Sequence, residues 1–111
     1  MAETVRSLYA LIDPEPIGRE RRTKHTWGPS LTEQHLLPWP RVVLMEVSPS
    51  DAMLYRYASD GSFGGDTWHE SEAEAREAAT WEYEPLIADW DEVPAGADPT
   101  DFAIERATDL I

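Results

Sequence analysis

The sequence predicts an α+β fold, in which a mostly antiparallel sheet of four or five strands packs on one helix and a second helix follows at the C-terminal end. Three observations lead to this prediction. Apolar segments of strand length, separated by short turns, fill residues 41–69. A capped, alanine-rich segment begins at Ser71, and Asp98 followed by Pro99 marks another helix start. With 111 residues, we expect one domain spanning 1–111.

The first predicted element lies around residues 5–12. Val5, Leu8, Tyr9 and Ile12 fit one helical face, but the same run also suits a strand buried on both sides. We favour the strand. The Asp-Pro-Glu-Pro sequence of residues 13–16 ends it, because each proline lacks an N–H donor and restricts the residue before it.

Residues 14–40 read as a long irregular loop, because five glycines and prolines interrupt residues 17–40: Gly18, Gly28, Pro29, Pro38 and Pro40. Ser30 and Glu33 have the spacing of a capping box, which predicts one helical turn after Ser30. Loops of this length in a small domain are usually functional or mobile.

A compact core is predicted over residues 41–93, beginning with strands at 41–47 and 53–58. Only five residues, 48–52, separate these two strands, so they should pair antiparallel. The glycine-rich segment 59–66 then turns the chain into a short third strand at 67–69.

The predicted helix after Ser71 should stop near Tyr83, because Pro85 disfavours a helical conformation at the residue before it. Glu74 stands at the capping-box position. Residues 86–90 are predicted as a fourth strand, and 98–111 as the C-terminal helix region, with the helix running from Pro99 to about Asp109. Its modest apolar stripe suggests a helix on the flank of the domain.

The surplus charge lies entirely in the second half of the chain. Residues 1–59 carry seven acids and seven bases, whereas residues 60–111 carry fifteen acids and two bases, which gives the net charge of −13. This distribution disfavours nucleic acid and acidic membranes as partners and favours a basic protein. The alternative, that acidity is a bias of the whole proteome, remains open.

Glu82 falls on the predicted core-facing side of its helix, so its carboxylate needs a partner. The candidates for a buried ion pair are Arg41, Arg56 and His69. The alternative is that the helix frays before Pro85 and leaves Glu82 in contact with solvent. A small enzyme, or a ligand- or metal-binding protein, that uses Asp66, His69 and Glu82 as a pocket is the alternative. No metal is predicted, because neighbouring strand residues such as His69 and Glu70 face opposite sides. No catalytic residue and no cofactor is assigned, since the sequence lacks any recognisable nucleophile or phosphate-binding motif.

The only basic cluster precedes Trp27 and consists of Arg19, Arg21, Arg22, Lys24 and His25. Basic residues beside an aromatic can grip phosphates. With the net charge of −13, a contact with the acidic half of the same chain, or with a second copy, is the more economical role. A homodimer is therefore a candidate assembly.

Several aromatic residues exceed the needs of one small core, and tryptophan commonly anchors protein interfaces. The interface candidates are Trp81 and Trp90 with the acids around them: Glu77, Glu84, Asp91 and Glu92. The alternative is that each tryptophan completes the core.

The stretch 55–93 resembles a block found in small bacterial proteins of unassigned function. The matching segments are Tyr-Arg-Tyr at 55–57, Asp-Gly at 60–61, Asp-Thr-Trp-His at 66–69, the helix segment 74–82 and residues 90–94. The resemblance implies the order strand, turn, strand, helix, strand, and no mechanism. Small acidic α+β proteins of bacteria also include many immunity proteins, which is a similarity of type.

We therefore expect a cytoplasmic, non-enzymatic protein-binding module that docks on a basic surface, with an immunity- or inhibitor-like role as its most concrete form. The absence of cysteine is compatible with a reducing compartment, and no segment has the length and apolarity of a membrane span. The alternatives are the small enzyme and a nucleic-acid mimic, which would place carboxylates in rows at phosphate spacing.

Overall fold

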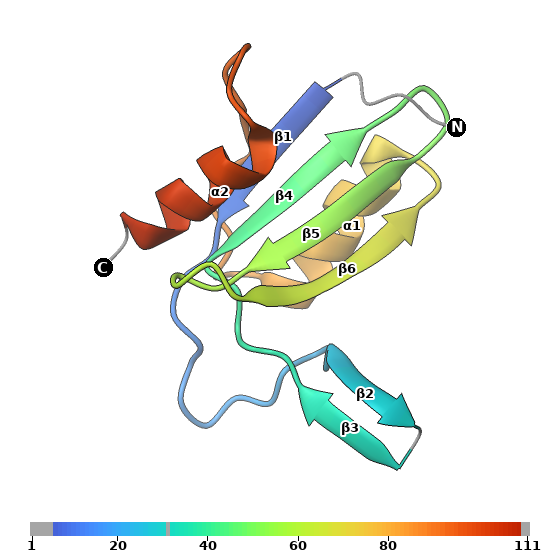
Figure 1. The fold of residues 1–111 in the computed structure, drawn as a ribbon, viewed down its shortest axis with the longest axis vertical. Helices are drawn as coiled ribbons and strands as arrows, with labels where there is room; N and C mark the ends of the chain where they lie inside the picture. Colours follow the sequence, from blue (N-terminus) through green and yellow to red (C-terminus); the bar gives the residue numbers. More distant parts are fainter. Residues whose placement is uncertain (1–5, 31, 110–111) are drawn as a thin grey trace.

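The computed structural model describes residues 6–30 and 32–109. Its centre is a five-stranded antiparallel sheet with the order β6-β5-β4-β1-β7 (Figure 1). The strands are β1 (Arg6–Leu11), β4 (Val42–Val47), β5 (Ala52–Tyr57), β6 (Phe63–His69) and β7 (Asp91–Glu92). The sheet confirms the predicted α+β class and the N-terminal strand, and β6 is longer than the predicted third strand.

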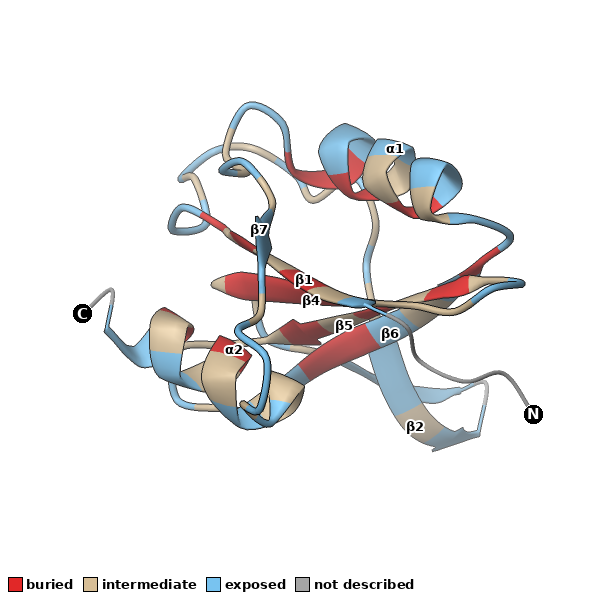
Figure 2. Cartoon of the chain, turned by 90° about the horizontal axis from the view of Figure 1, so that it is seen from above, coloured by how far each residue is buried: buried red, intermediate tan, exposed pale blue. Residues whose placement is uncertain are grey.

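Each face of the sheet is covered by one helix, α1 (Glu72–Tyr83) or α2 (Pro99–Thr108), as Figure 2 shows from above. Strand side chains alternate between the faces. Leu8, Val43 and Leu54 are among those packed under α1, whereas Val42 and Leu44 pack against Ala103 and Ala107 of α2. The C-terminal helix therefore lies over β4 and β1, not on the flank.

The helix boundaries follow from the predicted caps. Ser71 accepts a hydrogen bond from the Glu74 N–H through its hydroxyl (3.1 Å), and α1 ends at Tyr83 as expected. Asp98 caps α2 in the same way, accepting from the Asp101 N–H at 2.9 Å, with Pro99 in the first turn. Neither of these helices has the length and apolarity that crossing a membrane requires.

The predicted helical turn after Ser30 is wrong. Strands β2 (Thr26–Ser30) and β3 (Glu33–Leu36) form a separate antiparallel hairpin, which stands apart from the main sheet (Figure 1). The Ser30 hydroxyl bonds the Thr32 hydroxyl, and Ser30 pairs with Glu33 across the hairpin. In the hairpin, the Ser30 hydroxyl and the backbone of Ser30 and Glu33 thus have partners other than those of a capping box. We call residues 13–40, which carry this hairpin, the arm.

The predicted strand at 86–90 is also corrected. Ile87 forms a single bridge with Ile12, and regular pairing with β1 occurs only at β7, residues Asp91–Glu92. Between them Trp90 packs partly buried against the core below α1. The segment follows the edge of β1, but the register slips by one residue on the way, which prevents a continuous ladder.

Candidate functional site

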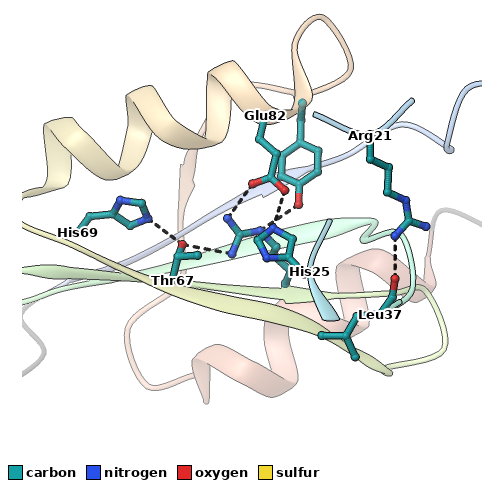
Figure 3. A network of polar contacts seen from close by, with 8 residues as sticks. Arg21, His25, Leu37, Thr67, His69 and Glu82 are labelled. Carbon is teal, nitrogen blue, oxygen red and sulfur yellow. Dashed lines mark hydrogen bonds and ion pairs between the residues drawn. The ribbon is translucent and has the colours of Figure 1, made fainter. Parts of the chain in front are cut away.

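A buried polar network connects the sheet to the last turn of α1 (Figure 3). Arg56 lies on the face of β5 below α1 and is only 1% exposed. Its guanidinium donates to the Tyr83 hydroxyl (2.9 Å), the Glu82 carboxylate (2.9 Å) and the Thr67 hydroxyl (3.3 Å). Each of the three guanidinium nitrogens has a partner, so the buried charge is neutralised and no nitrogen is left without a hydrogen bond.

Glu82 also anchors the arm. Its second carboxylate oxygen lies 2.6 Å from Nε2 of His25, a residue at the base of the β2–β3 hairpin. Burial alone would raise the pKa of Glu82, but the hydrogen bond with His25 and the charge of Arg56 outweigh it, so the pKa lies below its ordinary value. The carboxylate is therefore ionised and links three parts of the chain: β5, α1 and the arm.

The arm reaches this position because β6 carries two glycines beneath it. Gly65 has φ +113°, and a Cβ placed there would lie 2.9 Å from the Cβ of His25. At Gly64 a Cβ would lie 3.2 Å from the carbonyl oxygen of Pro38. The glycines thus permit close approach of the arm, which is the physical reason for Gly-Gly inside a strand.

His69 joins the network from β6. Its Nε2 lies 2.7 Å from the Thr67 hydroxyl, and its Nδ1 lies 3.7 Å from the Glu74 carboxylate. Burial and, secondarily, the charge of Arg56 lower the pKa of His69. The imidazole is therefore neutral at pH 7 and acts as a structural hydrogen-bonding group.

The structure does not assemble the pocket of Asp66, His69 and Glu82. Asp66 pairs with Tyr55 on the opposite face of the sheet, whereas His69 and Glu82 both reach the Arg56 network. The cavity beside Glu82 and His25 measures about 10 Å³, which admits no ligand larger than water. Within residues 6–30 and 32–109, no three side chains are grouped as a metal site would require.

A stripe of two glutamates, an alanine and a tryptophan runs along the outside of α1. Glu74, Glu77, Ala78 and Trp81 follow the spacing of one helical face and line a shallow groove of about 310 Å³. We call these four residues the outer stripe. Trp81 is 55% exposed, an unusual state for so large an apolar ring.

The charges of the outer stripe are largely uncompensated. Among the described residues Glu77 has no cation within ion-pair distance, and Glu74 has only the neutral His69. Next to Trp81 there is a cation, because the guanidinium of Arg22 of the arm lies 5.9 Å from the centre of the indole ring. Arg22 also donates to the Trp81 carbonyl oxygen and to Glu84 (3.3 Å), so Glu84 is paired.

The other interface candidates lie elsewhere. Trp90 is half-buried against the core, with the Arg76 guanidinium 5.9 Å from its ring centre, and is not an exposed anchor. Asp91 and Glu92 are exposed on β7, where Glu92 pairs with Arg6 at 3.2 Å. Only Trp81 and Glu77 of the six predicted residues therefore share one open surface with free charge.

Sequence reasoning identified part of the network. Arg56 was one of three partners expected for Glu82, whereas Arg41 instead donates to the carbonyl oxygen of Ile12. His25 was missed as the second partner. A cluster of basic residues in a long loop, together with one core-facing carboxylate, could have indicated the contact between His25 and Glu82. However, no local sequence pattern determines where a loop packs on the rest of the fold.

No family model matches the chain, and no match exists among the curated proteins or the solved structures.

Proposed function

We propose that the protein is a non-enzymatic binding module that docks on a basic protein surface through the outer stripe of α1. An immunity- or inhibitor-like role in the bacterial cytoplasm is the most concrete form of this proposal. The observation that carries it is the exposed Trp81 at the end of a groove lined by Glu74 and Glu77. An aromatic anchor beside unpaired carboxylates combines burial of apolar area with attraction of a cationic partner.

The stripe is also rigid, which favours docking. Ala75, Ala79 and Tyr83 fix the inner face of α1 in the core, and the Arg56–Glu82 pair holds its last turn. The tryptophan is thus presented by a helix that does not need to reorganise on binding, and pre-organisation lowers the entropic cost of association.

No specific observation favours the enzyme alternative. The Arg56 network contains charged and titratable groups, but the cavity beside it is nearly filled and its hydrogen bonds are internal to the fold. Catalytic groups need access to substrate.

The test compares wild-type protein with Trp81→Ala as bait for partners in extracts of the native cell, followed by binding kinetics with the captured protein. We expect Trp81→Ala to weaken binding by roughly 30-fold or more, as for a central aromatic anchor. Glu77→Gln should slow association mainly at low salt, because complementary charge acts chiefly on the on-rate.

The matched control is Trp68→Ala. Trp68 is 58% exposed, close to the exposure of Trp81, but it lies on β6 with its side chain on the face of the sheet opposite α1. Its replacement should leave partner binding unchanged. Equal losses for both tryptophan variants, or an association rate that does not depend on salt, would refute the docking of a basic partner on the outer stripe.

A further inference from the structure

The β2–β3 hairpin is an incomplete sheet. All nine residues of its two strands are exposed except Gly28, which is intermediate. Trp27 (59%) and Leu36 (53%) project from opposite faces, since Trp27 pairs with His35 and Leu36 with Thr26. Isolated two-stranded hairpins are marginal in water, and unpaired edges template addition of another strand.

The hairpin is nevertheless held in place at its base. The Leu37 N–H donates to the His25 carbonyl oxygen (2.8 Å), Arg21 donates to the Leu37 carbonyl oxygen (2.7 Å), and His25 contacts Glu82. The hairpin therefore projects in a defined direction away from the main sheet (Figure 1).

The two edges differ. Strand β2 contains Pro29, which has no N–H and blunts an edge for strand addition. Strand β3 has no proline. Since the pair 25/37 is hydrogen-bonded and such pairs alternate, Gln34 and Leu36 direct their backbone N–H and C=O groups away from β2. The β3 edge is thus open and able to pair.

The charge of the hairpin indicates which partner can pair with the β3 edge. Residues 26–36 carry a single formal charge, Glu33, in a chain of net charge −13. The net negative charge makes two copies repel one another, but the hairpins stand apart from the main sheet and its two helices, so they can meet without bringing those parts together (Figure 1). If the two β3 strands pair antiparallel about a two-fold axis perpendicular to the sheet, odd-numbered residues face odd-numbered ones and even-numbered residues face even-numbered ones. In the register centred on Gln34, Glu33 of each copy lies opposite His35 of the other, which gives two such pairs.

We propose that two copies of this chain associate through antiparallel pairing of their β3 edges, which joins the two hairpins into one four-stranded sheet. Gln34 pairs with Gln34 of the other copy at the centre, and Glu33 meets His35 on either side. Trp27, which already contacts His35 with ring centres 5.2 Å apart, covers these pairs from one face. This interface is separate from the outer stripe of α1.

The test is sedimentation equilibrium over a concentration series at low and high salt. We expect a dimer whose dissociation constant falls as salt rises, because salt screens the repulsion between two acidic bodies. Binding to a basic partner through the outer stripe has the opposite salt dependence, so the two proposals fail independently. A monomer at every concentration and salt would overturn this one.

Two variants locate the contact. Both Gln34→Pro and Gln34→Ala lose the side-chain hydrogen bond to the Ser30 carbonyl oxygen. Only Gln34→Pro also removes the backbone N–H that points away from β2. We expect the proline variant alone to raise the dissociation constant, by roughly tenfold or more. Equal effects of the two variants, or none, would overturn pairing at the β3 edge.

A charge exchange tests the register even if the proline variant disturbs the hairpin. Glu33→Lys should weaken the dimer, because it removes the attraction to His35, and the combined Glu33→Lys and His35→Glu variant should restore it. Failure of the second exchange to restore association would exclude the register centred on Gln34.

Discussion

At the scale of single residues, the ion pair between Arg56 and Glu82 holds together most of the buried polar network. Glu82 is 6% exposed and Arg56 still less, so removal of either leaves a buried, uncompensated charge. We expect Glu82→Ala to lower the free energy of unfolding by about 3–5 kcal/mol, measured by urea denaturation.

Glu77→Ala is the matched control, since Glu77 lies on the same helix but is exposed and unpaired among the described residues. Its effect should stay within about 0.5 kcal/mol. Replacing both members of the buried pair, with Arg56→Met and Glu82→Leu, should recover much of the stability that Glu82→Ala loses. If Glu82→Ala were as mild as Glu77→Ala, the pair would not be a structural link.

The titration of His69 and Glu82 predicts two separate steps in acid stability. The pKa of His69 is lowered from 6.5, so the unfolded chain binds the proton first and stability falls as the pH drops below 6.5. The pKa of Glu82 is lowered from 4.5, so its contribution is complete above 4.5 and is lost as the pH falls through the lower folded value.

Unfolding free energies measured across this range should separate the two steps. His69→Gln should flatten the slope between about pH 7 and pH 5, and leave the loss below pH 4.5 in place. Arg56, Glu74 and Glu82 remain around the replaced side chain. An unchanged slope in the upper range would show that His69 does not titrate as its burial requires.

At the scale of elements, the sequence was sufficient where one local signal decides the structure. Ser71 and Asp98 are caps with a single geometric solution, and both helices begin there. The strands β4 and β5 are apolar and joined by a short turn, which leaves antiparallel pairing as the simple outcome.

The sequence was insufficient where two signals compete. Gly28, Pro29 and an irregular register conceal the alternation of β2, while Ser30 and Glu33 imitate a capping box. At the candidate site, helical periodicity predicted that Glu82 faces inward and that Trp81 lies beside acids. The contacts of His25 and Arg22 with α1 depend on the path of the arm, which tertiary packing sets.

The passage of the arm over β6 gives a prediction about Gly65. Gly65→Ala combines an unfavourable positive φ with a Cβ 2.9 Å from His25, so we expect a loss of about 1–3 kcal/mol and faster proteolysis within residues 17–24. Gly96→Ala is the control, because Gly96 also has positive φ (+87°) but has open space around it. Equal protease sensitivity of the two variants would argue against the packing of the arm on this glycine.

At the scale of the whole molecule, the net charge of −13 opposes compactness. The described ion pairs around α1, such as Arg6 with Glu72 and Arg76 with Glu72, leave many carboxylates without a cation. We therefore expect the midpoint of thermal unfolding to rise with salt concentration, because screening weakens the repulsion between carboxylates. A midpoint that falls with salt would mean that attractive ion pairs dominate instead.

Strands β1 and β4 are neighbours, and the Ile12 N–H donates to the Arg41 carbonyl oxygen at 2.9 Å. The chain thus departs from the sheet and returns to it at one spot, so the intervening excursion behaves as an insertion between two adjoining strands. Such an insertion can be trimmed or exchanged without altering strand order, much as a long connection tolerates length changes. A version shortened within 17–37 would retain the helix that carries Trp81 while lacking the hairpin, and would therefore separate the proposed docking of a basic protein from the proposed association of two copies.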